Sequence, residues 1–160
     1  MTWRRRRQRT GASSIEFALL LPWVIFLFVG AFDWGFYAHA LISTENATRV
    51  AAIYAANLGG GSISKTTACT LVLNELSIAA NVAGQTTCVW GTSVTDASPV
   101  GVTETCTTVD SVSSVQVAVT YRTLQLIPIP GVLAGKATLY RTATLPMNAS
   151  DNGGSCPTPS

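Results

Sequence analysis

The chain opens on a charged stretch and then becomes almost continuously apolar. From Phe17 to Phe32 the sequence FALLLPWVIFLFVGAF contains no charged or strongly polar side chain. Counted from Ala12, the apolar span is 21 residues long, with Glu16 as its single charge. That length is enough to cross about 30 Å of hydrocarbon at about 1.5 Å per residue. The pattern therefore predicts a membrane-spanning helix near the N-terminus.

Apolar positions keep recurring after Asp33, mostly at steps of three or four residues, which is the period of a helix. They are Ala38, Leu41, Ile42, Ala47, Val50, Ala51, Tyr54 and Ala55. The sequence NLGGG at 57–61 is a strong stop signal, because glycine readily takes the left-handed conformation found just beyond helix ends. We predict one helix over about 12–57, roughly 69 Å long.

The second half of the chain changes to a pattern typical of strands. Val112–Tyr121 (VSSVQVAVTY) and Lys136–Pro146 (KATLYRTATLP) alternate between apolar or small and polar residues, as half-buried strands do. Cys88–Gly91 and Val100–Thr107 predict shorter strands. Between the two main strands, Leu124–Gly135 is apolar but broken by prolines, which favours a packed connection.

A short second helix is predicted at Thr70–Val82 (TLVLNELSIAANV), with Gly84 as its end. Together these elements predict an α+β fold, in which a long N-terminal transmembrane helix packs on a small antiparallel β-sheet. The predicted organisation is a basic leader (1–11), the transmembrane and extended helix (12–57), an extracytoplasmic α+β domain (58–147) and a polar tail (148–160).

The distribution of charge gives this helix an orientation. Charged residues make up only 11% of the chain, against 48% hydrophobic residues. Five arginines lie in the first nine residues, and without them the net charge of +2 becomes −3. The positive-inside rule then leaves the N-terminus in the cytoplasm and everything after Asp33 outside it. We expect a single-pass protein of a bacterial inner membrane, and no nucleic-acid partner.

All four cysteines follow the apolar segment: Cys69, Cys88, Cys106 and Cys156. None forms a CxxC pair, and the single histidine, His39, is distant, so the sequence does not favour a zinc site. An even number of widely spaced cysteines fits two disulfides in an oxidising compartment. Three pairings remain open.

The junction between leader and helix carries the clearest functional signal. The basic leader ends at Gly11, and Glu16 follows five residues later at the start of the apolar span. A carboxylate at the centre of a membrane costs about 2.5–3.5 kcal/mol on insertion scales, and less near the interface, so it usually has a partner. Cleavage after Gly11 would leave an α-amino group on Ala12, with a reference pKa of about 7.7–8.0, and that cation could neutralise Glu16.

Gly11–Pro22 (GASSIEFALLLP) resembles the start of the TadE-like pseudopilins, a minor pilin family of the tight-adherence (Tad/Flp) type IV pilus system. Asn46–Ala56 (NATRVAAIYAA) is similar to their Asn-Ala-x-Arg-x-x-Ala stretch, and Val115–Met147 resembles their C-terminal strand, proline-rich turn and strand. The resemblance implies a pilin-like helix and cleavage between Gly11 and Ala12 by a prepilin peptidase.

The same resemblance implies a minor subunit or assembly factor that acts with other pilins, pseudopilins and the pilus assembly machinery. Glu16, with Phe17 beside it, would pair with the amino terminus of an adjacent subunit. No catalytic set, cofactor site or metal site is recognised in the sequence, and we expect the protein not to be an enzyme.

Three other interpretations remain open. The chain could be an unprocessed single-pass envelope scaffold that keeps its leader. It could instead be a membrane-anchored periplasmic enzyme or binding domain, with an unrecognised site between Gly60 and Asp110. Finally, Ala38-His39-Ala40 is an A-x-A triplet of the kind that ends cleavable secretory signals.

Overall fold

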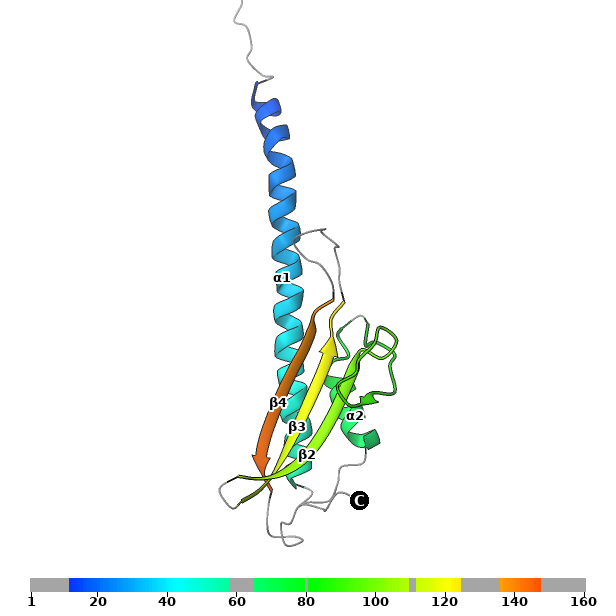
Figure 1. Cartoon of the computed structure of the whole chain (residues 1–160). Helices are drawn as coiled ribbons and strands as arrows, with labels where there is room; N and C mark the ends of the chain where they lie inside the picture. The colour runs from blue at the N-terminus through cyan, green and yellow to red at the C-terminus, as the bar shows by residue number, and fades with distance from the viewer. Residues whose placement is uncertain (1–11, 58–64, 80, 110–111, 125–135, 148–160) are drawn as a thin grey trace, which may run out of the picture. The chain divides into compact units, whose positions relative to one another are not determined.

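The computed structural model of the chain describes residues 12–57, 65–79, 81–109, 112–124 and 136–147. Helices and strands follow one another along these residues as Figure 1 shows. They are α1 (Ala12–Asn57), α2 (Lys65–Glu75), β1 (Val89–Trp90), β2 (Val100–Val109), β3 (Val112–Arg122) and β4 (Thr138–Pro146). The long N-terminal helix, the short second helix and the sheet confirm the predicted α+β fold.

The chain divides into two units, Met1–Phe36 and Tyr37–Ser160. The helix α1 runs through this boundary without a break, because every residue from Ala12 to Asn57 is helical. This is the single helix that the apolar pattern predicted. The first unit contributes the apolar start of α1, and the second contains the rest of α1 together with α2 and the sheet.

The sheet has the strand order β1-β2-β3-β4, with β3 antiparallel to both β2 and β4. The prediction of a purely antiparallel sheet was wrong at one edge, since β1 pairs parallel to β2 through Val89 with Gly101 and Trp90 with Val102. The physical reason is that residues 91–99 return the chain to the start of β2, so that both strands run the same way.

Two glycines allow the close approach at this parallel edge. Gly91 has a φ of 136°, which L side chains rarely adopt, and its N–H donates to the carbonyl of Val102 at 3.0 Å. A Cβ on Gly101 would run into the carbonyl oxygen of Gly91. Both positions therefore require glycine for backbone reasons rather than for chain flexibility.

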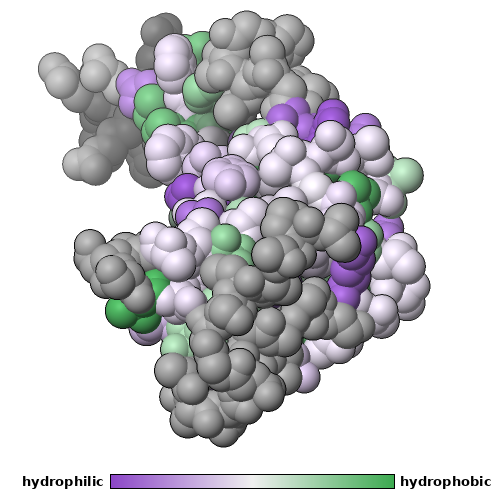
Figure 2. All heavy atoms as spheres, turned by 60° about the horizontal axis from the view of Figure 1, so that its bottom comes forward, coloured by the Kyte–Doolittle hydropathy of each residue, from purple (hydrophilic) through white to green (hydrophobic). Residues whose placement is uncertain are grey.

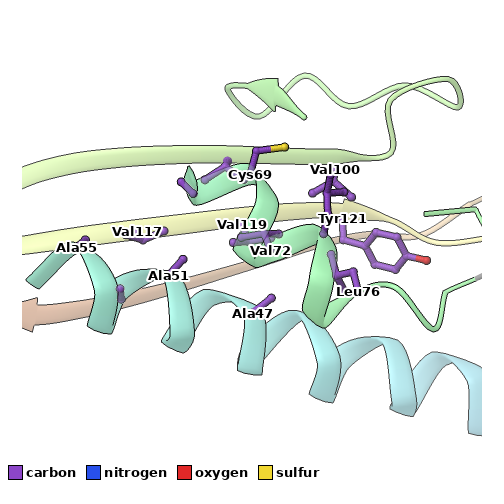
Figure 3. Packing of buried hydrophobic residues seen from close by; sticks show 14 of the residues in the cluster. Ala47, Ala51, Ala55, Cys69, Val72, Leu76, Val100, Val117, Val119 and Tyr121 are labelled. Atoms are coloured by element: carbon purple, nitrogen blue, oxygen red, sulfur yellow. The ribbon is translucent and has the colours of Figure 1, made fainter. Parts of the chain in front are cut away.

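The core of the second unit lies between one face of the sheet and the two helices. Small side chains on α1, spaced four residues apart at Ala47, Ala51 and Ala55, face the valines of β3 (Figure 3). Alanines at these positions let the helix backbone lie close to the sheet. Val72 and Leu76 fill the space beside them.

The buried threonines of α1 do not leave unpaired hydroxyl groups in this core. Thr44 donates to the carbonyl of Ala40, and Thr48 donates to the carbonyl of Thr44, both at 2.7 Å. Each polar group is thus satisfied one helical turn away, within its own helix.

The second helix lies earlier in the chain than predicted. We expected it at Thr70–Val82, whereas α2 spans Lys65–Glu75 and Gly84 is not its end. Beyond Glu75 the backbone continues in three-residue turns, with the N–H groups of Ala79 and Val82 each bonded three residues back at 2.9 Å. Such turns keep apolar residues spaced by three on one side, so Leu76 and Val82 stay buried without a helix.

The strand predictions agree more closely with the structure. The two alternating segments are β3 and β4, and the two shorter candidates are β1 and β2, with β2 extending to Val109. The predicted connection at Leu124–Gly135 lies outside the described residues beyond Leu124, and so do the NLGGG stop signal after Asn57 and the tail at 148–160.

Candidate functional site

Most of the large apolar side chains in the described part of the first unit are exposed, whereas Val29 is half-buried. Those more than half exposed are Ile15, Phe17, Leu19, Leu20, Trp23, Val24, Ile25, Phe26, Leu27, Phe28, Phe32, Trp34 and Phe36. Within the described residues, one helix is long and apolar enough to cross a membrane, and none of its most apolar window is buried. An uncovered apolar surface this large needs lipid or another protein.

Aromatic side chains cluster toward the C-terminal end of this apolar segment. The ring centroids of Phe28 and Phe32 lie 6.4 Å apart, and those of Phe32 and Phe36 lie 4.9 Å apart, so the three form a stripe with four-residue spacing. Trp34 and Tyr37 add amphipathic rings next to Asp33. Aromatic residues of this kind are enriched where membrane helices enter the interface.

The predicted processing site falls partly outside the described residues. Gly11 is outside them, and Ala12 is the first residue of α1. Glu16 follows Ala12 by four residues and is exposed, as is Phe17 beside it. A residue four positions on lies one helical turn away, on the same face. The exposed Glu16 side chain is therefore available to a neighbouring group.

The structure joins two of the predicted disulfide candidates. Cys69 on α2 and Cys88 just before β1 form a disulfide, with Cα atoms 5.6 Å apart. Cys106 on β2 is also disulfide-bonded, whereas Cys156 lies outside the described residues. Lys65 reinforces the first link, because its Nζ lies 5.4 Å from the ring centroid of Trp90 on β1. Both contacts hold α2 against the parallel edge of the sheet.

A cluster of charged groups joins the 91–99 loop to the ends of β3 and β4. Asp96 Oδ2 lies 2.8 Å from Lys136 Nζ, and Asp96 Oδ1 lies 3.1 Å from Arg122 Nε. The Arg122 contact is ionic, since Nε is not aligned for a hydrogen bond. The hydrogen bond from Lys136 holds the pKa of Asp96 below its ordinary value, and the Arg122 charge adds to this against a desolvation effect of opposite sign.

Of this cluster, only Asp96 lies in the segment between Gly60 and Asp110, where an unrecognised catalytic or binding site was considered. Its one carboxylate is already paired with two cations, and no cysteine or histidine joins it among the described contacts. Within the part of the chain that the structure describes, no group of three metal-ligating side chains occurs. The arrangement serves to tie the loop to the sheet.

A groove of about 660 Å³ lies in the second unit between α1 and β4. Glu45, Thr48, Arg49 and Ile53 line it from the helix, and Arg141–Leu145 lines it from the strand. Sequence reasoning predicted β4 as a strand but not this groove, because the alternating pattern does not reveal which strand lies at the edge.

The family model described as TadE-like protein matches residues 11–52 of the chain. This N-terminal segment is TadE-like. The match begins at Gly11, includes Glu16 and Phe17, and extends through Arg49 into the part of α1 that packs on the sheet. It confirms the resemblance found in the sequence over this segment. No curated protein and no solved structure matches the chain.

The TadE-like match and the exposed apolar helix point to the same general role. The family is one of Tad pilus components, and the helix has the length and the uncovered apolar surface of a membrane anchor. Together they indicate a membrane-anchored protein associated with a Tad pilus. The similarity that the sequence suggested for Val115–Met147 lies beyond the matched segment and stays a prediction.

Proposed function

We propose that this protein is a minor pilin or assembly factor of a Tad/Flp-type pilus, anchored by α1 in the bacterial inner membrane. One observation carries the proposal. The TadE-like segment is a single helix that exposes apolar side chains in its first part and supplies core alanines to the folded unit in its second. Such a helix serves both as a membrane anchor and as part of the fold, which suits assembly rather than catalysis.

The proposed orientation places the leader in the cytoplasm and the second unit in the periplasm. The arginines at positions 4–9 support it through the positive-inside rule. The Cys69–Cys88 disulfide supports it independently, because disulfides form and persist in oxidising compartments such as the periplasm.

We further propose that a prepilin peptidase cuts between Gly11 and Ala12. The family match starts at Gly11, and α1 starts at Ala12, so the mature protein would begin with the helix itself. The new α-amino group would then pair with Glu16 of an adjacent subunit, with Phe17 in the contact between helices. Pairing would remove the cost of an uncompensated carboxylate in the membrane.

An unprocessed single-pass scaffold is the second candidate, since anchoring by α1 does not require cleavage. A cleaved secretory signal is less well supported. α1 continues without a break through Ala38–Ala40, and Ala40 and Leu41 pack against the core of the second unit. Residues around this triplet therefore belong to the fold.

The first experiment is to determine the mature N-terminus by mass spectrometry of the protein from its native membrane. A start at Ala12 is expected and supports prepilin processing. A start at Met1 or Thr2 would keep the anchor and favour the unprocessed scaffold. A start at Leu41 would overturn the membrane-anchored role altogether.

The role of Glu16 is tested in pilus assembly. Glu16→Ala should reduce pilus number strongly, because the proposed partner of the subunit amino group is lost. Asp33→Ala, which removes a carboxylate at the other end of the apolar span, is the matched control and should assemble pili normally. Normal piliation in the Glu16→Ala strain would contradict the proposed pairing.

A further inference from the structure

The strand β4 lies at the edge of the described sheet, next to the groove beside α1. Its pairing with β3 shows which backbone groups face outward. Thr123 N–H donates to the carbonyl of Ala137 at 2.8 Å, and Met147 N–H donates to the carbonyl of Ser113 at 2.9 Å. Both pairs continue the β3–β4 register, in which odd-numbered residues of β4 face odd-numbered residues of β3.

In an antiparallel pair, hydrogen-bonded and non-hydrogen-bonded residue pairs alternate. The odd-numbered residues of β4 therefore direct their N–H and C=O groups toward β3, and the even-numbered residues direct theirs away. Tyr140, Thr142 and Thr144 present an outward N–H, whereas Pro146 has none. All three are exposed, so within the described residues this row of backbone groups is open to another strand, apart from the Tyr140 carbonyl, which accepts from Arg141.

The charges around the groove are unbalanced. Arg49 is paired with Glu45 at 2.6 Å. The guanidinium of Arg141 instead donates to the outward carbonyl of Tyr140 at 3.1 Å, and within the described part of the chain it has no carboxylate partner. The groove therefore carries a net positive charge beside apolar contacts from Ile53 and Leu145. An incoming strand with a carboxylate opposite Arg141 would complement it.

The described surface that Figure 2 brings forward, at the end of the second unit toward which β4 runs, carries few strongly apolar or charged residues. In Figure 2 the coloured atoms are mostly pale, with small purple and green spots, as expected for a surface rich in threonine, serine and alanine. On the described atoms seen from that side, no broad apolar patch is visible.

We propose that the free edge of β4 and the groove beside α1 form a docking site for an extended, acidic segment of another polypeptide, which adds a fifth strand to the sheet. Backbone pairing with Tyr140, Thr142 and Thr144 would supply affinity, and the contact of a carboxylate with Arg141 would supply specificity. Arg141 belongs to a position that would form a non-hydrogen-bonded pair with the new strand, where side chains approach closely.

A second copy of the chain related by a two-fold axis is not the occupant. Antiparallel pairing of two β4 edges would reverse one copy, so that the parts of the two α1 helices that pack on the sheets would run in opposite directions, which does not suit two chains anchored by their N-terminal segments in one membrane. In a parallel contact about a two-fold axis, each even-numbered residue of β4 would lie opposite the same residue of the other copy, so that both would direct their backbone groups toward each other. In a parallel pair of strands, a residue that directs its N–H and C=O groups toward the partner strand lies opposite a residue that directs its own away. The argument against an antiparallel second copy rests on the proposed membrane anchoring. The proposed docking of a peptide strand on β4 does not.

The test uses the full chain in lipid nanodiscs and a fluorescein-labelled synthetic peptide, Thr-Val-Thr-Asp-Thr-Val-Thr, with binding followed by fluorescence anisotropy. Saturable binding is expected. Arg141→Glu should weaken it about tenfold or more, the loss expected for one charge-assisted hydrogen bond. Arg141→Lys should retain most of it. A peptide with Lys in place of Asp should show the reverse preference and bind better to Arg141→Glu.

The edge is tested separately from the charge. Thr142→Pro removes an outward N–H and should abolish binding, whereas Thr142→Val keeps that N–H and should bind normally. Hydrogen exchange of the unmutated protein provides a measurement that does not depend on the folding of any variant. Adding the peptide should slow exchange at Thr142 and Thr144, while Arg141 and Ala143 are protected from the start.

Three results would overturn the proposal: no saturable binding, equal binding to Arg141→Glu, or unchanged exchange at Thr142 and Thr144. Dimers that form without peptide and are lost in Thr142→Pro would also overturn it, in favour of self-association. Peptide binding does not depend on where the leader is cut. Its failure would therefore leave the proposed pilus role standing, and a failed N-terminal assignment would leave the docking site standing.

Discussion

The phenolic hydroxyl of Tyr121 on β3 donates a 2.7 Å hydrogen bond to Oδ1 of Asn81, in the turns that follow α2. The amide of Asn81 in turn donates to the carbonyl of Arg122 at 2.9 Å. A single side chain thus pairs two neighbouring polar groups of β3, forty and forty-one residues away. These bonds explain how the irregular segment after α2 is held against the sheet.

We expect Asn81→Ala to lower the free energy of unfolding by about 1–3 kcal/mol, because the buried Tyr121 hydroxyl and the Arg122 carbonyl lose their partner. Tyr121→Phe should cost less, about 1 kcal/mol, since it removes the donor and leaves a partly exposed amide. Chemical denaturation of the full chain in detergent micelles measures both. Equal stability of Asn81→Ala and the unmutated protein would contradict this account.

The same tyrosine gives an alkaline dependence. Burial raises the pKa of Tyr121 above its ordinary value, and the Asn81 hydrogen bond partly opposes this. A group whose pKa is higher in the folded state stabilises the fold fully below the unfolded pKa, about 10. This contribution is lost as pH rises through the folded pKa. Above about pH 10, the Tyr121→Phe variant should therefore lose stability less steeply than the unmutated protein. Chemical denaturation at several pH values measures this dependence.

The ion cluster at Asp96 gives an acid dependence of opposite sign. Its pKa is lowered, first by the hydrogen bond from Lys136, so its contribution is present above the unfolded value of 3.8 and is lost as pH falls below that. Asp96→Asn should flatten this part of the stability profile. Glu45→Gln is the control. Glu45 forms an exposed i,i+4 ion pair with Arg49, and such surface pairs contribute little to stability. A profile unchanged by Asp96→Asn would show that the cluster contributes nothing.

Gly101 is expected to tolerate no side chain. A Cβ there meets the backbone carbonyl of Gly91, a residue whose own N–H is held by a hydrogen bond to the Val102 carbonyl. Gly101→Ala should destabilise the fold by about 1–3 kcal/mol, the usual range for overpacking. Gly35→Ala is the matched control, since nothing lies near a Cβ at that helical position. The melting temperature should fall for the first variant and stay level or rise for the second.

The Cys69–Cys88 bond closes a loop with a sequence separation of 19. Replacing both cysteines by serine should reduce stability by about 3 kcal/mol, because the unfolded chain gains the freedom of that loop. Denaturation under non-reducing conditions tests this. Peptide mapping tests the connectivity. If Cys69 is bonded to Cys88 and all four cysteines are paired, the second disulfide joins Cys106 to Cys156. A Cys69–Cys106 peptide would show that the pairing is wrong.

Local patterns were sufficient for the elements whose own residues determine them. The apolar run and its helical continuation predicted α1, and the alternation from Val112 onward predicted β3. The second helix was misplaced because apolar residues spaced by three, such as Leu76, Ala79 and Val82, suit a helix and a series of tight turns equally well. The backbone hydrogen bonds of Ala79 and Val82 to carbonyls three residues back distinguish the two, and the hydrogen bonds of Asn81 hold the turns against β3.

The candidate site divides in the same way. Gly11, Ala12 and Glu16 were found from the sequence because the signal is local, a basic leader followed by a carboxylate at fixed spacing. The four cysteines were recognised as disulfide candidates, yet their pairing was open, since pairing depends on which segments the fold brings together. The groove at Arg141 and the ion cluster at Asp96 had no local signal at all.

The amino-acid sequence by itself thus determined the membrane-anchoring helix, its orientation signal and the TadE-like character of its first residues, because these depend on composition and spacing within one continuous segment. Only the tertiary structure decided that β1 pairs parallel to β2, that Cys69 bonds to Cys88, and that β4 is an edge strand of the described sheet. These features depend on contacts between residues far apart in the chain, and many arrangements of the same elements satisfy the local patterns equally well.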